Sequence, residues 1–86
     1  MIIEKKTTPE FFQKILENIK TFDLRLNDFE CKQGDILLLR EYNPETKSYT
    51  GRKLEKKIKF VLKTKDLKFW TKEEIDKNGF IVLGFD

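Results

Sequence analysis

Histidine is absent from the chain, and cysteine occurs only once, at Cys31. A lone cysteine forms no internal disulfide, and without histidine the chain lacks the usual zinc ligands and the base of a Ser-His-Asp or Cys-His catalytic pair. This leaves open only a carboxylate-bound Mg²⁺ site, and no paired acidic motif indicates one. We therefore expect no metal and no other cofactor.

Long hydrophobic runs are also missing. No apolar segment approaches the roughly 20 residues needed to cross a bilayer, and residues 1–6 lack a signal peptide's order of basic and then apolar residues. Together with the single cysteine, this predicts a cytoplasmic protein without a membrane segment. Residues 1–86 are enough for one domain with a small core, and neither a repeat nor a linker divides them. A monomer is the default expectation.

Charged residues are as frequent as apolar ones, at 38% each, and the formal net charge is +3. Apolar runs that recur along the chain, with eight phenylalanines among them, distinguish it from a disordered tail. The small positive excess permits an anionic partner but does not require one, because many small domains carry such a charge.

A helix is predicted from Pro9, with Thr8 as its N-cap. Asn18 suits the left-handed conformation that ends many helices. Residues 1–6 before the helix predict a short edge strand. The positions that recur at helical spacing and are expected to pack on the sheet are Phe12, Ile15, Leu16 and Ile19.

Residues 21–26 alternate between apolar and polar side chains, which predicts a strand. Its core face would carry Phe22, Leu24 and Leu26, and its other face Thr21, Asp23 and Arg25, with Lys20 at the strand entrance. This polar row fits either a solvated surface or a ligand site. After a turn at Gly34-Asp35, the unbroken apolar run at residues 36–39 predicts a strand buried on both faces.

The second half predicts a turn at residues 43–48, an alternating strand at residues 53–63, a short helix from a Thr71–Glu74 capping box to Asn78, and a closing strand at residues 80–85. The lysines on the outer face of residues 53–63 form either a solvated face or a phosphate track. The expected fold is α+β: a small barrel of five to six mostly antiparallel strands with one N-terminal helix and one short late helix. An open α+β sheet is the alternative.

Residues 18–25 resemble the Gly-x-Lys-x-x-Glu-x-Arg signature of ASCH domains, which are relatives of the PUA domain. Residues 32–37 resemble the Gly-Asp opening of the next ASCH strand, and residues 41–43, 49–52 and 79–84 resemble segments of very small phage and bacterial ASCH/PUA-like proteins. The resemblance covers residues 9–85. Asn18 stands where the signature has glycine, and Asp23 where it has glutamate.

The resemblance implies a cleft between the first helix and the barrel that binds RNA or a nucleotide. Lys20 and Arg25 would donate to a phosphate or a base carbonyl, and Asp23 would orient Arg25 or accept from an exocyclic amine. The ligand-binding residues expected from the resemblance are Lys20, Thr21, Asp23, Arg25, Tyr42 and Arg52. Tyr42, Tyr49 and Trp70 are candidates for base stacking, although tryptophan in so small a domain more often packs in the core.

Two other classes of function remain. Some small ASCH relatives hydrolyse acetylated cytidine with a lysine, a threonine and a glutamate, and Lys20 matches the lysine. Their threonine falls at Asp23, beside Thr21, and their carboxylate lies in an insertion that is shorter here. The catalytic candidates are Lys20, Thr21, Asp23, Glu73 and Glu74. A phage or bacterial protein-interaction module is the third class. Binding is preferred to catalysis, because a base without its nucleophile is incomplete.

Overall fold

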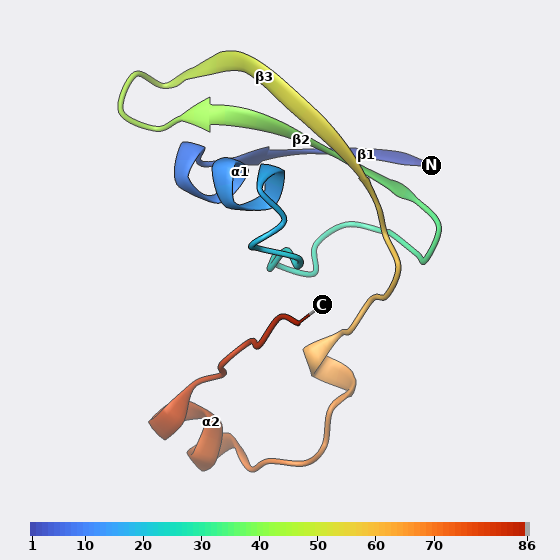
Figure 1. Cartoon of the computed structure of the whole chain (residues 1–86). Helices are drawn as coiled ribbons and strands as arrows, with labels where there is room; N and C mark the ends of the chain where they lie inside the picture. The colour runs from blue at the N-terminus through green and yellow to red at the C-terminus, as the bar shows by residue number, and fades with distance from the viewer. Residues whose placement is uncertain (86) are drawn as a thin grey trace.

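The computed structural model describes residues 1–85, which form a three-stranded open sheet and two α-helices (Figure 1). The elements in chain order are β1 (Ile2–Thr7), α1 (Pro9–Leu16), β2 (Ile36–Asn43), β3 (Ser48–Lys57), the 3₁₀ turn η1 (Thr64–Asp66) and α2 (Lys72–Asn78). The α+β class is therefore as predicted.

The sheet has the order β1-β2-β3, with β1 parallel to β2 and β3 antiparallel to it. The parallel pair requires a crossover between β1 and β2, and α1 lies within that crossover against one face of the sheet (Figure 1). The core lies between this helix and the sheet. Its buried apolar side chains are Ile3, Phe12, Ile15 and Leu39.

Helix α1 begins as the sequence predicts. Thr8 occupies the N-cap position without a side-chain hydrogen bond, and Pro9 is the first helical residue. The helix ends at Leu16, and Asn18 takes the left-handed conformation predicted for it, with φ 60°. Leu16 and Ile19 consequently lie on exposed surface rather than on the sheet.

The predicted turn between β2 and β3 is confirmed. The side-chain oxygen of Asn43 accepts hydrogen bonds from the backbone N–H groups of Glu45 and Thr46, at 2.9 and 3.4 Å. The apolar run at the start of β2 is buried less than predicted. Leu39 is fully buried, but Ile36 and Leu38 are only half-buried, because the sheet face opposite α1 has no covering layer among residues 1–85.

Two predicted strands, at residues 21–26 and 80–85, are not formed, and the alternating strand ends at Lys57 rather than at residue 63. Alternation reflects a preference for extended backbone, but a strand also needs a hydrogen-bonded neighbour. No backbone hydrogen bond joins residues 21–26 to residues 80–85 in the described part of the chain. A barrel of five to six strands is therefore not shown.

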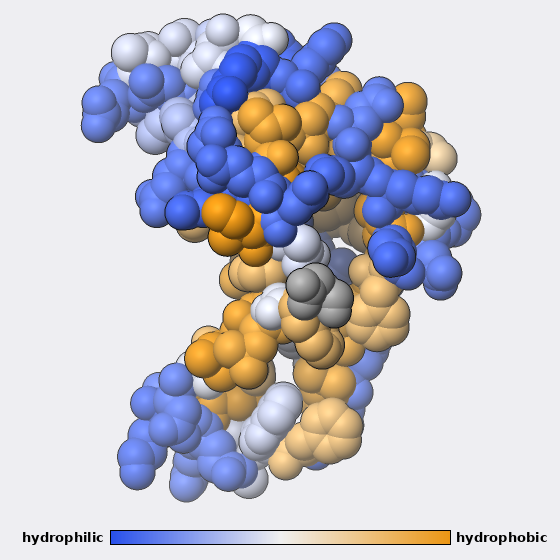
Figure 2. All heavy atoms as spheres, in the orientation of Figure 1, coloured by the Kyte–Doolittle hydropathy of each residue, from blue (hydrophilic) through white to orange (hydrophobic). Residues whose placement is uncertain are grey.

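The burial of residues 21–26 is also the reverse of the prediction. Leu24 and Leu26 are 70% and 81% exposed, whereas Asp23 and Arg25 are half-buried. Further apolar side chains are exposed in the C-terminal half, and Figure 2 shows hydrophobic residues across the middle and lower part of the molecule. The core of the domain is accordingly confined to the sheet and α1.

Helix α2 carries the predicted capping box. The hydroxyl of Thr71 accepts from the N–H of Glu74, whose carboxylate accepts from the N–H of Thr71, at 3.1 and 2.9 Å. Gly79 ends the helix with φ 65°. Neither helix in residues 1–85 is long and apolar enough to cross a membrane.

Candidate functional site

Three of the predicted site residues meet in the loop after α1. Arg25 donates from Nε to Asp23 Oδ2 at 2.6 Å and from Nη2 to Asp23 Oδ1 at 3.5 Å. Lys20 Nζ lies 3.8 Å from Asp23 Oδ1 and donates to the carbonyl oxygen of Phe22 at 2.8 Å. The loop therefore holds two cations around one carboxylate, and all three side chains are partly buried.

Aromatic rings surround the Lys20 ammonium. Its Nζ is 5.1 Å from the ring centroid of Phe11 on α1 and 4.7 Å from that of Phe22. Burial lowers the pKa of Lys20, and nearby Arg25 lowers it further, while Asp23 acts in the opposite direction. Lys20 is thus a cation in a partly desolvated setting, where a hydrogen bond to an anion is stronger than in bulk water.

The C-terminal segment passes directly over this loop. A Cβ atom on Gly84 would lie 2.8 Å from Cδ1 of Phe22 and 3.5 Å from Oγ1 of Thr21. Only a glycine fits here without displacement of the Phe22 ring. Thr21 is exposed and lies next to the C-terminal segment and to the charged group of three residues.

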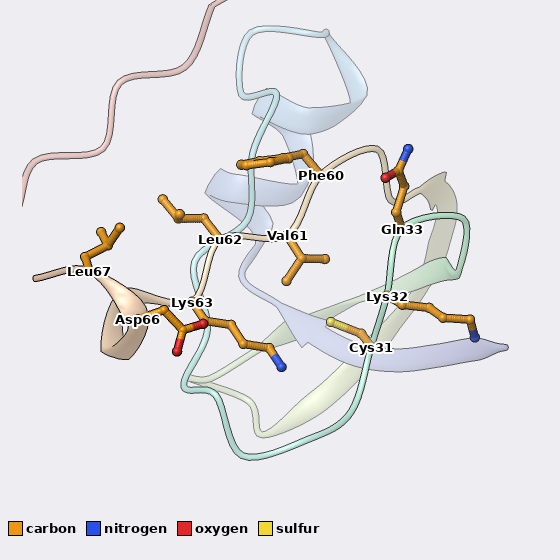
Figure 3. A pocket seen from close by; sticks show the side chains of 9 residues that line it. All are labelled: Cys31, Lys32, Gln33, Phe60, Val61, Leu62, Lys63, Asp66 and Leu67. Carbon is orange, nitrogen blue, oxygen red and sulfur yellow. The ribbon is translucent and has the colours of Figure 1, made fainter.

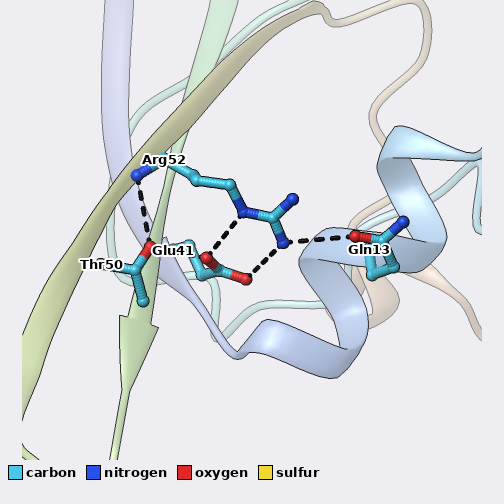
Figure 4. Close-up of polar contacts among 4 residues, drawn as sticks. All are labelled: Gln13, Glu41, Thr50 and Arg52. Atoms are coloured by element: carbon cyan, nitrogen blue, oxygen red, sulfur yellow. Dashed lines mark hydrogen bonds and ion pairs between the residues drawn. The ribbon is translucent and has the colours of Figure 1, made fainter.

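Arg52 belongs to a separate cluster between the sheet and α1 (Figure 4). Its Nε and Nη2 donate to the two carboxylate oxygens of Glu41 at 2.9 and 2.8 Å, and Nη2 also donates to Gln13 Oε1 on α1 at 3.2 Å. Thr50 donates to Glu41 Oε1 at 2.5 Å. Arg52 therefore links β3 to both β2 and the helix.

A bulge in β3 creates this second cluster. Arg40 pairs with Lys53 and Tyr42 pairs with Tyr49, so that three residues of β3, numbers 50–52, stand opposite Glu41 alone. Gly51, in the middle, has φ 98°, a conformation that favours glycine. The bulge aims the side chains of residues 50 and 52 at the same carboxylate.

The buried Glu41 carboxylate is held in its ionised form. Hydrogen bonds from Arg52 and Thr50 lower the pKa of Glu41 to about 2, and the hydrogen bond to Glu41 raises the pKa of Arg52. Sequence reasoning singled out Arg52 but not Glu41, because a buried glutamate is recognised only once the bulge sets the register of the hairpin. Because Arg52 donates to Glu41 and Gln13, its main role is to stabilise the contact between the sheet and α1 rather than to bind a ligand.

Tyr42 lies on the opposite face of the sheet from Glu41. Its ring meets that of Tyr49 edge to face, with centroids 5.2 Å apart. Lys6 Nζ is 4.3 Å from the Tyr42 centroid, and the Arg40 guanidinium carbon is 3.8 Å from the Tyr49 centroid. Sequence reasoning did not single out Lys6 or Arg40, although every second residue of β1 and β2 shares a face.

The two glutamate candidates lie on α2. Glu74 uses its carboxylate to cap this helix, and Glu73 is exposed in the first turn. No hydrogen bond or ion pair joins either residue to Lys20 within residues 1–85. The structure therefore brings together Lys20, Asp23 and Arg25, with Thr21 adjacent, and places Tyr42 and Arg52 on the two faces of the sheet.

A cavity of about 410 Å³ lies apart from all of these residues (Figure 3). Its walls are mainly apolar and are formed by residues 31–33, 60–63 and 66–67, among them the free Cys31. No group of three or more potential metal ligands occurs in the part of the chain that the structure describes.

The molecule is thus a small, charged α+β domain with one group of basic side chains in the loop after α1, Lys20 and Arg25, and another on the outer face of the sheet, Lys6 and Arg40. The family described as "Domain of unknown function (DUF3850)" matches residues 2–85, and the chain belongs to this family. No curated protein and no solved structure matches the chain.

Proposed function

We propose that this domain binds single-stranded RNA or a nucleotide, and that the loop of residues 20–25 beside α1 contributes the phosphate-binding cations. The observation that carries the proposal is the convergence of Lys20 and Arg25 on Asp23 in a partly buried setting. Asp23 orients both cations without neutralising them, because two positive charges share one negative charge.

The donor count supports an anionic ligand. A guanidinium has five N–H donors and Asp23 takes two from Arg25, while an ammonium has three and the Phe22 carbonyl takes one from Lys20. The remaining donors are available to phosphate oxygens, for which charge-assisted hydrogen bonds are the strongest kind. Thr21, next to them, adds a hydroxyl that can donate or accept.

We further propose that the DUF3850 domain is a PUA-like relative of the ASCH domains. Two positions that are glycine in the ASCH pattern have a left-handed backbone here. Asn18, which replaces the signature glycine, has φ 60°, and Gly34 of the Gly-Asp turn has φ 96°. Asp35 of that turn is buried and accepts from the backbone N–H of Lys32 at 3.0 Å. In this proposal the extended segments at residues 21–26 and 80–85 correspond to barrel strands.

Fluorescence anisotropy of a labelled single-stranded oligonucleotide at low salt tests the binding function. We expect Lys20→Ala and Arg25→Ala each to weaken binding at least tenfold, with little change in the melting curve. Lys77→Ala is the matched control, since it removes the same charge from the last turn of α2, outside the loop. Absence of binding by the wild-type protein would overturn the proposal.

Hydrolysis of an acetylated cytidine is the second candidate, favoured by the lowered pKa of Lys20 beside Thr21. In this reaction water adds to the acetyl carbonyl, the C–N bond breaks, and cytidine and acetate are released. Incubation with N4-acetylcytidine followed by chromatography tests it. The activity is established if the wild-type protein releases cytidine and the Lys20→Ala variant does not. An unchanged substrate peak with the wild-type protein excludes the activity. The capping role of Glu74 and the distant placement of α2 favour binding over catalysis.

A further inference from the structure

The sheet face opposite α1 is a second candidate surface. Side chains of residues paired across a sheet point to the same side, so the register places Lys6, Arg40 and Lys53 in one row and Tyr42 beside Tyr49. Figure 1 shows no helix over this face. The surface therefore carries both rings and cations on rigid strands.

The two tyrosines and two of the cations form one contiguous group. Besides its contact with Tyr42, Lys6 Nζ lies 5.8 Å from the Tyr49 centroid, and Arg40 stacks on Tyr49 at 3.8 Å. Tyr49 is 40% exposed. A base approaching the face meets the Tyr49 ring and the planar Arg40 guanidinium, two groups on which unpaired bases stack.

Positive charge continues along β3 beyond the rings. Lys53 and Lys57 are exposed on the same face, separated by Glu55, and the Glu4 carboxylate is paired with Arg40 Nη1 at 3.4 Å. Four residues of a strand span about 13 Å. That exceeds the length of one nucleotide in an extended strand, so the charged row fits a strand of nucleotides rather than a single nucleotide.

We propose that this face is a stacking platform for single-stranded RNA. Bases stack on Tyr49 and Arg40. Tyr42 and Lys6 support the Tyr49 ring from the side. The sugar-phosphate backbone of the RNA follows Lys53 and Lys57. Single strands are favoured over duplex because only unpaired bases expose a flat face to an aromatic ring. The inference rests on the proposed RNA-binding function and gives it a second surface, on the far side of the sheet from α1.

The test uses a 12-nucleotide labelled oligouridine and the full chain. Stacking on one aromatic ring is worth about 1–3 kcal/mol, so Tyr49→Leu is expected to weaken binding at least fivefold. Tyr49→Phe is the matched control, because it keeps the ring and is expected to bind within twofold of the wild type. Circular dichroism and melting of each variant establish that the sheet remains folded.

The two proposals fail in different ways. If Tyr49→Leu and Lys53→Gln bind oligouridine like the wild type while Lys20→Ala loses binding, the platform is overturned and the loop site stands. If the tyrosine variant loses binding and Lys20→Ala does not, the platform stands without the loop. Equal affinity for a duplex of the same length, unaffected by Tyr49→Leu, would overturn the platform, and no binding by the wild type would overturn both.

Discussion

Arg52 joins three elements through one side chain: β3, which carries it, β2 through Glu41, and α1 through Gln13. Glu41 is buried, so the loss of its cation leaves an ionised carboxylate whose remaining side-chain donor among residues 1–85 is Thr50. A buried charged group that loses its partner costs about 1–3 kcal/mol or more. This cluster is therefore expected to contribute more to stability than the exposed ion pairs.

Replacement of Arg52 tests this expectation. We expect Arg52→Ala to lower the free energy of unfolding by about 1–3 kcal/mol through the unpaired Glu41 carboxylate, as measured by urea denaturation. Arg52→Lys should recover only part of the loss, because an ammonium lacks the two-pronged geometry that matches a carboxylate. Lys72→Ala, which breaks an exposed pair with Asp76 at 2.8 Å, is the control and should cost under about 1 kcal/mol. Equal losses in the control and the alanine variant would contradict the prediction.

The Glu41 carboxylate also predicts the acid response of the protein. Its pKa is about 2 in the folded state and 4.5 ordinarily, because Arg52 and Thr50 donate to it. Between these values the unfolded chain binds the proton and the folded chain does not, so stability falls as pH decreases from about 4.5 toward 2. Melting temperatures across this range should fall more steeply for the wild type than for Glu41→Gln. Parallel curves would show that Glu41 does not control the acid response.

At the scale of elements, α2 is the clearest case of a helix defined by its ends. Thr71 and Glu74 cap its start reciprocally, Gly79 ends it, and none of its residues is buried. Without a packed face, a seven-residue helix depends on these caps.

Thr71→Ala is therefore expected to destabilise α2 locally by about 1 kcal/mol and to leave the melting of the sheet unchanged. Amide hydrogen exchange, measured residue by residue, should become faster within residues 72–78 only. Thr64→Ala, which removes a hydroxyl outside the helix, is the matched control. Faster exchange in β2 would contradict the local effect.

The elements that the sequence predicted correctly are those with local signals. Pro9 after Thr8, the Asn43 turn and the Thr71–Glu74 capping box each involve residues within four positions of one another, so the pattern contains the whole interaction. The charged group of the loop was predictable for the same reason, because Asp23 and Arg25 are two residues apart. Glu41 and Arg52 were not paired from sequence, since their contact depends on a bulge across the hairpin.

The unformed strands illustrate the opposite case. Residues 21–26 have the alternation of a strand, but pairing depends on a distant partner. Gly84 lies against Phe22 and Thr21, yet no backbone hydrogen bond joins residues 21–26 to residues 80–85 in the described part of the chain. The alternation also indicated the wrong buried side. Leu24 is 70% exposed, whereas its neighbours Asp23 and Arg25 are half-buried and hydrogen-bonded to each other. An extended pattern identifies candidate strands, whereas burial is decided by what packs on them.

At the scale of the whole molecule, the two proposed RNA contacts put cations on both sides of the sheet. The loop contributes Lys20 and Arg25 beside α1, and the outer face contributes Lys53 and Lys57 along β3. If both places contact the backbone of one RNA strand, the salt dependence of binding reports their sum, because each neutralised phosphate releases counterions. Stacking contributes affinity without this dependence.

A salt series on the oligouridine complex separates the two contributions. For single strands, the slope of log K against log salt is about −0.7 for each phosphate neutralised. The double variant Lys53→Gln/Lys57→Gln should therefore make the slope shallower by about 1.4, whereas Tyr49→Leu should lower affinity at every salt concentration and leave the slope unchanged. If the lysine variant changed affinity with no change in slope, the lysines would not contact phosphates, and β3 would carry them as a solvated face.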